Sequence, residues 1–180
     1  NEAVDEVIDI AAKEGIDAGI VKGGTLEIAR NRAQAARLAA AAAAERRWQV
    51  DGIEELSRDE ARQRIALSDV VAAYHNPHCA RIQPAQLVRG LADTVAALGV
   101  DIYERSPVVE IAAGRAATPR GTVTAPIVLR ATEGFTAGLP GLKRRWLPMN
   151  SSMIATDPIP AHVWDAIGWQ GRETLGDTAH

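Results

Sequence analysis

The sequence predicts a mixed α/β fold, and three observations support this. Residues 84–99, PAQLVRGLADTVAALG, place apolar side chains at helical spacing and end on a glycine. The next segment, VDIYERSPVVEI, alternates and is rich in β-branched residues, which is typical of a strand. Residues 114–132 then hold short β-like pieces separated by glycine and proline, which predict a small antiparallel meander beside an α/β layer.

The first third of the chain predicts two helices and a strand. Val4, Val7 and Ile8 fall on one helical stripe within residues 1–15. The alternation of residues 25–28 predicts a strand, and Gly23-Gly24 before it favours a turn or bulge of a β-hairpin. Residues 31–48 have the highest helix propensity of the chain, and their many alanines predict a surface or lightly packed helix.

Further elements follow along the chain. Ser57 and Glu60 form the capping-box pattern at the start of a third helix, over residues 57–66. Residues 75–83 read as a proline-bearing loop, and residues 127–129 as a continuous apolar strand. Residues 149–157 are another strand candidate, and residues 161–169 predict a short helix after two X-Pro breaks.

Composition narrows the class of protein. The chain has 180 residues, of which 47% are hydrophobic and 24% charged, so it can build a core. Its net charge of −3 gives no electrostatic footprint for nucleic acid or an acidic membrane. No apolar run approaches bilayer length, and the acidic N-terminal residues are unlike a signal peptide. We therefore expect a cytoplasmic protein, with which the single cysteine, Cys79, is compatible.

Several groups of residues invite a chemical reading. His75, His78 and Cys79 could ligate a metal, but their spacing matches no zinc motif, so we favour an ordinary loop and predict no metal. Residues 143–145, KRR, could hold an anion or form a solvated turn. Ser151 and Ser152 could meet a ligand or form the polar face of a half-exposed strand. Three of the four tryptophans lie near the end of the sequence, where they favour a core or an interface.

Three stretches together resemble the D-amino-acid oxidase and glycine oxidase-like family of FAD-dependent oxidoreductases. They are ARIQPAQLVRGLADTVAALGVDIYERSPVVEI, TVTAPIVLRATEGFTAGLPGLKRRWLPMNSSMIATDPIP and GIDAGIVKGGTLEIARNRAQ. Their order and spacing carry the resemblance through essentially the whole chain.

The resemblance implies a flavoprotein of two domains: a glutathione-reductase-type FAD-binding domain and a mixed-sheet substrate domain. It assigns residues 1–77 and 137–180 to the substrate domain and residues 78–136 to the FAD-binding domain. Val108 would hold the adenine end of FAD through its backbone. Ala131, Thr132 and Gly134 of the segment ATEG would line the pyrophosphate, where small residues let the backbone approach the cofactor.

The resemblance also implies an activity. The enzyme would oxidise the C–N bond of an amine or amino acid to an imine, with oxygen as acceptor. A flavin dehydrogenase with another acceptor and a non-catalytic binding module remain alternatives.

Parts of the family pattern are absent from this sequence. It contains no G-x-G-x-x-G fingerprint, and it lacks the stretch in which relatives carry their carboxylate-binding arginine. We therefore expect an internal segment that neither binds FAD tightly nor turns over substrate alone. No catalytic residue can be named, and the sequence leaves the oligomeric state open.

Overall fold

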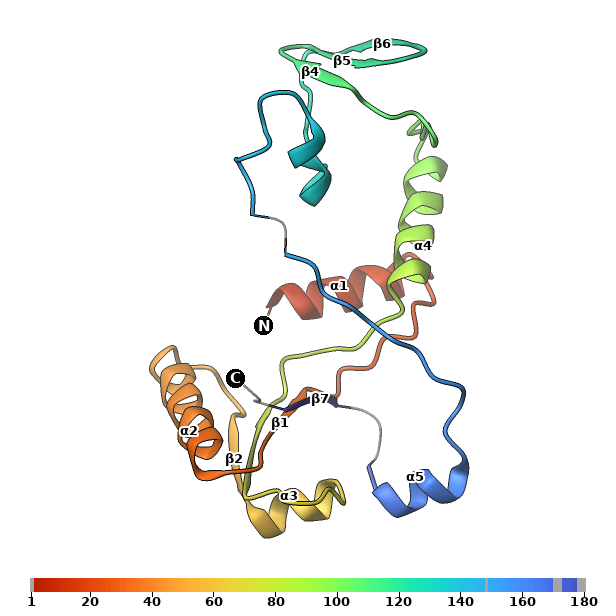
Figure 1. Cartoon of the computed structure of the whole chain (residues 1–180). Coiled ribbons are helices and arrows are strands. Elements are labelled where there is room, and N and C mark those ends of the chain that lie inside the picture. Colours follow the sequence, from red (N-terminus) through yellow and green to blue (C-terminus); the bar gives the residue numbers. More distant parts are fainter. Residues whose placement is uncertain (1, 148, 170–172, 178–180) are drawn as a thin grey trace. The chain divides into compact units, whose positions relative to one another are not determined.

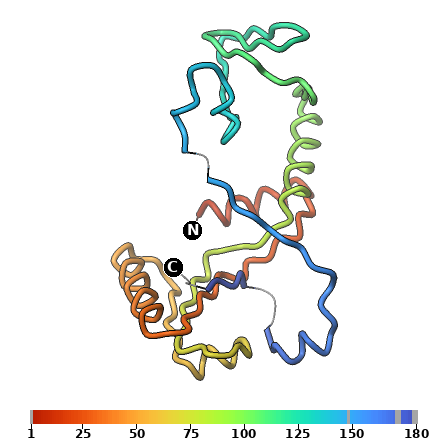
Figure 2. Tube along the Cα trace, viewed as in Figure 1, coloured from red at the N-terminus to blue at the C-terminus, as the bar shows by residue number. Residues whose placement is uncertain are grey.

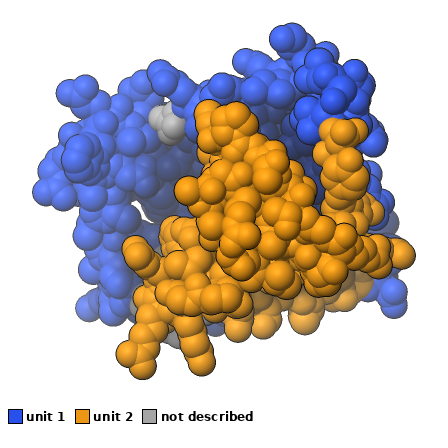
Figure 3. Space-filling model, turned by 90° about the horizontal axis from the view of Figure 1, so that it is seen from above, with its two compact units in different colours: residues 1–100, 157–180 blue, residues 101–156 orange. Residues whose placement is uncertain are grey.

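A computed structural model describes residues 2–147, 149–169 and 173–177 of the chain (Figure 1). The chain divides into two compact units, which Figure 3 colours separately: unit 1, residues 1–100 and 157–180, and unit 2, residues 101–156. Helices and strands alternate along it, so the predicted mixed α/β class is confirmed. The assignment of residues 1–77, 78–136 and 137–180 to FAD-binding and substrate domains stays a prediction, because compactness alone does not identify which domain binds the cofactor.

Unit 1 is built on a four-stranded mixed sheet in the order β2-β3-β1-β7. The strands are β1 (Thr25–Ala29), β2 (Glu54–Ser57), β3 (Ala72–Asn76) and β7 (Thr174–Asp177). Strand β3 runs antiparallel to β1 and β2, whereas β7 runs parallel to β1. The trace in Figure 2 shows the dark blue end of the chain beside the red-orange β1, although about 150 residues separate them in sequence.

The predicted β1 is confirmed, but the hairpin around Gly23-Gly24 is wrong. Strand β1 pairs with β3 and β7, both remote in sequence, and not with a neighbouring segment. Strands β2, β3 and β7 were not predicted, because four or five residues such as EELS or TLGD carry too little alternation to indicate a strand.

The predicted helices are all present. They are α1 (Glu2–Lys13), α2 (Arg32–Arg47), α3 (Arg58–Arg64), α4 (Pro84–Ala97) and α5 (Ala161–Ile167). The capping box at α3 forms as predicted: the Ser57 side chain accepts from the Glu60 backbone N–H, and the Glu60 carboxylate accepts from the Ser57 backbone N–H. None of the helices in the described ranges is long and apolar enough to cross a membrane.

Helices cover both faces of the sheet and form two small cores. Leu26 and Ile28 of β1 point to one face, where they pack with Ala61 of α3 and with Ile65. On the other face Ala29 and Tyr74 meet α2 through its Leu38 and Ala42. Although α2 is rich in alanine, it packs at Leu38 and Ala42, whose exposed fractions are 5% and 0%.

Unit 2 contains the predicted meander and little other regular structure. Strands β4 (Glu110–Ala112), β5 (Arg115–Thr118) and β6 (Gly121–Thr124) form an antiparallel sheet in sequence order. A 3₁₀ helix, η1 (Glu133–Gly138), follows.

Three predicted strands of this region are wrong or shortened. The strand expected over residues 100–111 begins only at Glu110, and residues 127–129 and 149–157 form no strand. A strand requires a hydrogen-bonded neighbour, and neither sheet in the described part of the chain contains a strand that pairs with these segments. The apolar side chains that suggested strands consequently lie in solvent, with Ile127 77% and Leu129 88% exposed.

Candidate cofactor site

Three of the four predicted cofactor-binding residues, Ala131, Thr132 and Gly134, lie at the start of η1 in unit 2. Thr132 immediately precedes the helix, and its Oγ1 lies 2.7 Å from Oγ1 of Thr136. Thr136 is one of the few buried polar residues, with an exposed fraction of 2%. The hydroxyl pair therefore fixes this turn.

Glu133, between these residues, has an unusual backbone. Its φ is +45°, in the left-handed region that residues other than glycine rarely adopt. Its carboxylate accepts a hydrogen bond of 2.7 Å from the Gly134 backbone N–H. Such strained positions cluster at binding sites and active sites. A Cβ at Gly134 would have no atom within 4 Å, so open space lies beside this glycine.

The segment before this turn offers free backbone groups. Residues 127–131 form no backbone hydrogen bond with another described residue. Their N–H and C=O groups can therefore bind the polar atoms of a ligand, since backbone groups without a partner must be satisfied by water or a ligand.

Val108 lies elsewhere in unit 2, just before the meander. The next residue, Val109, donates its N–H to the Ala117 carbonyl oxygen at 2.9 Å, whereas the backbone of Val108 has no hydrogen-bond partner among the described residues. The structure thus gathers Ala131, Thr132 and Gly134 in one turn and places Val108 just before β4. The binding of FAD by these four residues stays a prediction.

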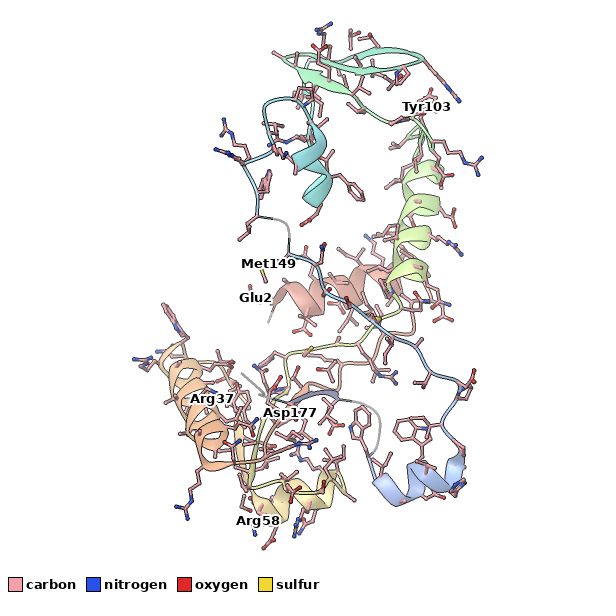
Figure 4. All side chains as sticks on the ribbon, viewed as in Figure 1. Glu2, Arg37, Arg58, Tyr103, Met149 and Asp177 are labelled. Atoms are coloured by element: carbon pink, nitrogen blue, oxygen red, sulfur yellow. The ribbon has the colours of Figure 1, made fainter. Side chains whose placement is uncertain are left out.

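A hollow of about 770 Å³ opens beside η1, within the size range of small-molecule sites. Its wall includes Arg130, Glu133, Gly134, Phe135, Trp146 and Met149, all of unit 2. Met149 is labelled on the segment that follows η1 in Figure 4. Neither Arg130 nor Phe135 was predicted from the sequence as a site residue. A signal for Arg130 was present, because this cation lies between the apolar run IVL and the segment ATEG.

The groups around this hollow suit part of an FAD molecule. A cation and free backbone N–H groups suit phosphate, and aromatic side chains suit a planar ring. The 180 residues contain no G-x-G-x-x-G fingerprint, the motif that binds the pyrophosphate in dinucleotide-binding domains.

His75, His78 and Cys79, the candidate metal ligands, contact other residues of unit 1. His75 Nε2 lies 3.4 Å from the Gly23 carbonyl oxygen, and His78 Nε2 lies 2.8 Å from that of Asp51. Cys79 Sγ lies 3.8 Å from Thr174 Oγ1. Within the described part of the chain, no three His, Cys, Asp or Glu side chains are arranged to hold a metal ion.

The remaining sequence candidates are exposed. Residues 143–145 and both Ser151 and Ser152 lie at the surface of unit 2. Ser151 and Ser152 belong to the segment that forms no strand, so neither reading based on a strand applies to them. Trp169 packs against the core of unit 1, as favoured for the late tryptophans, whereas Trp146 is 55% exposed in the hollow.

Tyr74 has the most perturbed side-chain electrostatics among the described residues. Burial raises its pKa to about 12, and the neighbouring Glu45 carboxylate acts in the same direction. The Tyr74 hydroxyl has no hydrogen-bond partner of good geometry among the described residues. It lies between β3 and α2, where it belongs to the core and not to the hollow of unit 2.

Comparisons with known proteins point in the same direction. The family model described as FAD dependent oxidoreductase matches residues 1–180. Over 115 residues the chain is 29% identical to a probable oxidoreductase, OrdL, of Haemophilus influenzae, an alignment that covers 59% of this chain and 27% of that protein.

Solved structures share the fold. A glycine oxidase from Bacillus cereus matches with a TM-score of 0.60 and 23% identity, over 68% of this chain and 37% of that one. An L-proline dehydrogenase from P. horikoshii matches with a TM-score of 0.67 and 16% identity, over 78% and 39%. An L-amino acid deaminase from Proteus vulgaris matches with a TM-score of 0.54 and 20% identity, over 67% and 31%. The chain therefore spans well under half the length of each of these proteins.

Proposed function

The chain belongs to the family of FAD-dependent oxidoreductases, and we propose that it serves an enzyme that oxidises the C–N bond of an amine or amino acid to an imine. The observation that carries this proposal is the family match over all 180 residues. Two proteins with the same fold, a glycine oxidase and an L-amino acid deaminase, support a small amine or amino acid as substrate.

In this proposal the chain supplies part of the cofactor site. When bound, FAD would supply the redox chemistry, while the protein binds and orients the reactants. Backbone groups of Val108 and Ala131 would bind polar atoms of FAD. Thr132 and Gly134 would shape the turn that approaches its pyrophosphate, since the Thr132–Thr136 hydroxyl pair holds that turn and Gly134 leaves space beside it.

We propose oxygen as the electron acceptor and the cytoplasm as the location. A second candidate is a dehydrogenase that passes electrons to another acceptor, which the L-proline dehydrogenase of the same fold favours. A third is a non-catalytic module, which the missing glycine fingerprint favours. The free backbone groups of residues 127–131 argue against the third candidate, because they leave room for a ligand.

The test uses the protein in its full natural length. Purified protein should show flavin absorbance, and an anaerobic titration with amino acids and amines should bleach that absorbance when the substrate class is correct. Admission of air should then restore the colour and release hydrogen peroxide in an amount equal to the substrate oxidised. Ammonia or an amine should appear as the imine hydrolyses.

Each candidate gives a different result. Bleaching that is reversed by an artificial dye but not by oxygen indicates the dehydrogenase. A folded protein that stays colourless with added FAD indicates the non-catalytic module. A flavoprotein that no amine or amino acid can bleach would refute oxidation of a C–N bond.

A further inference from the structure

We infer that Arg130 is an anion-binding residue of the cofactor site and neutralises a phosphate of FAD. This inference rests on the cofactor use that the proposed function requires. It goes beyond that proposal because it gives a side chain the role of binding a phosphate, whereas the residues predicted from the sequence act through their backbone or their small size.

The first observation is the charge of Arg130. Its side chain lines the hollow beside η1, and no carboxylate of a described residue lies within ion-pairing distance of it. The other charged residue of the wall, Glu133, turns its carboxylate onto the Gly134 backbone N–H. The wall therefore holds one cation and one carboxylate, and because the carboxylate bonds to the backbone and forms no ion pair with Arg130 in the described part of the chain, the guanidinium is free to bind an anion.

The second observation is the place of Arg130 in the chain. It directly precedes Ala131 and Thr132, which are predicted to line the pyrophosphate. The turn after it is held by the Thr132–Thr136 hydroxyl pair, so the position of the cation relative to the turn is restrained. A guanidinium presents its N–H donors in a planar fork that matches phosphate oxygens, which makes arginine suited to this task.

The third observation is the apolar part of the same wall. Phe135 and Met149 are each 89% exposed, and Trp146 is 55% exposed. Large exposed apolar side chains around one hollow mark a binding surface. Together with a cation they suit a ligand that joins an anionic group to a planar ring, as FAD does. An amino-acid substrate with an aromatic side chain shares this chemistry, so the experiment must separate the two ligands.

The experiment compares Arg130→Met with Arg130→Lys and with Arg120→Met in the full-length protein, after removal of the flavin. Arg120 is a matched control, because it is an exposed arginine of unit 2 outside the hollow. Dissociation constants for FAD and for riboflavin, which lacks phosphate, are measured by quenching of flavin fluorescence. Circular dichroism and the unfolding midpoint verify that each variant is folded.

We expect Arg130→Met to raise the dissociation constant for FAD roughly tenfold or more, because a lost hydrogen bond between charged groups is worth about one to two factors of ten. The constant for riboflavin should not change. Arg130→Lys should keep most of the FAD affinity, Arg120→Met should keep all of it, and added salt should weaken the wild type more than Arg130→Met.

Several results would overturn the inference. Equal FAD affinity of wild type and Arg130→Met refutes it, as does an equal loss for FAD and riboflavin, which indicates a structural role. A loss confined to the binding of an amino-acid substrate transfers Arg130 to the substrate site. If the wild type binds no FAD, the proposed function fails as well. If the wild type binds FAD but Arg130→Met binds it equally well, only the role of Arg130 is refuted and the proposed function stands.

Discussion

Replacement of Gly24 by alanine should destabilise unit 1 more than the same change at a left-handed glycine that has open space around it. Gly24 is buried at the start of β1 with a φ of +82°. A Cβ there would lie 2.5 Å from the Asn76 carbonyl oxygen, 2.6 Å from His75 Nε2 and 3.0 Å from the Pro77 Cα. Two of these contacts are with backbone atoms of β3 and the residue after it, so relief requires movement of the strand.

The magnitude follows from two contributions. The left-handed conformation costs an alanine about 1–2 kcal/mol. The overpacking against β3 adds roughly 1–3 kcal/mol. We therefore expect Gly24→Ala to lower the free energy of unfolding by about 2–5 kcal/mol.

Gly15→Ala separates the two contributions. Gly15 has a similar φ, +67°, but a Cβ there would meet nothing within 4 Å, so only the conformational cost of about 1–2 kcal/mol applies. Urea unfolding followed by tryptophan fluorescence measures both variants, because Trp169 packs against the core that contains Leu26 and Ile28 of β1. A loss for Gly24→Ala no larger than that for Gly15→Ala would refute the steric reasoning.

Three further changes test the packing and electrostatics of unit 1. Leu26→Ala, at a side chain that is fully buried, should cost about 2–5 kcal/mol in the same urea assay, and a loss under 1 kcal/mol would contradict the core described above. Ser57→Ala should cost about 1 kcal/mol through loss of the cap. Hydrogen bonds from Ser57 lower the pKa of Glu60 below 4.5, so the folded protein should lose stability as the pH falls through that lowered pKa. Unfolding curves at about pH 3 to 6 should show a less steep loss of stability in Ser57→Ala. Burial raises the pKa of Tyr74 from 10.0 to about 12, so the folded protein keeps a proton that the unfolded chain loses. Stability should therefore fall from pH 10 to 12, and Tyr74→Phe should remove part of this fall; an unchanged pH dependence in Tyr74→Phe would refute the assignment.

The sequence was enough to predict those elements that depend on contacts between residues close together in the chain. The capping box of Ser57 and Glu60, the spacing of apolar residues in α1 and the glycines around the meander each depend on contacts within a few residues. These elements form as predicted. The same holds for the family, because ordered motifs along one chain require no knowledge of the contacts between them.

The pairing of strands that are distant in the chain could not be predicted from the sequence. Nothing in TLGD indicates that it lies beside β1, and the apolar run at residues 127–129 predicts a strand although no described segment pairs with it. The site shows the same division. The sequence indicated ATEG through its small residues. Arg130, which forms no ion pair with a described residue, and the aromatic side chains of Phe135 and Trp146 become a candidate site only because the fold brings them around one hollow. Helix, cap and turn are determined by short-range contacts, whereas strand pairing and the wall of a site depend on which remote residues the fold brings together.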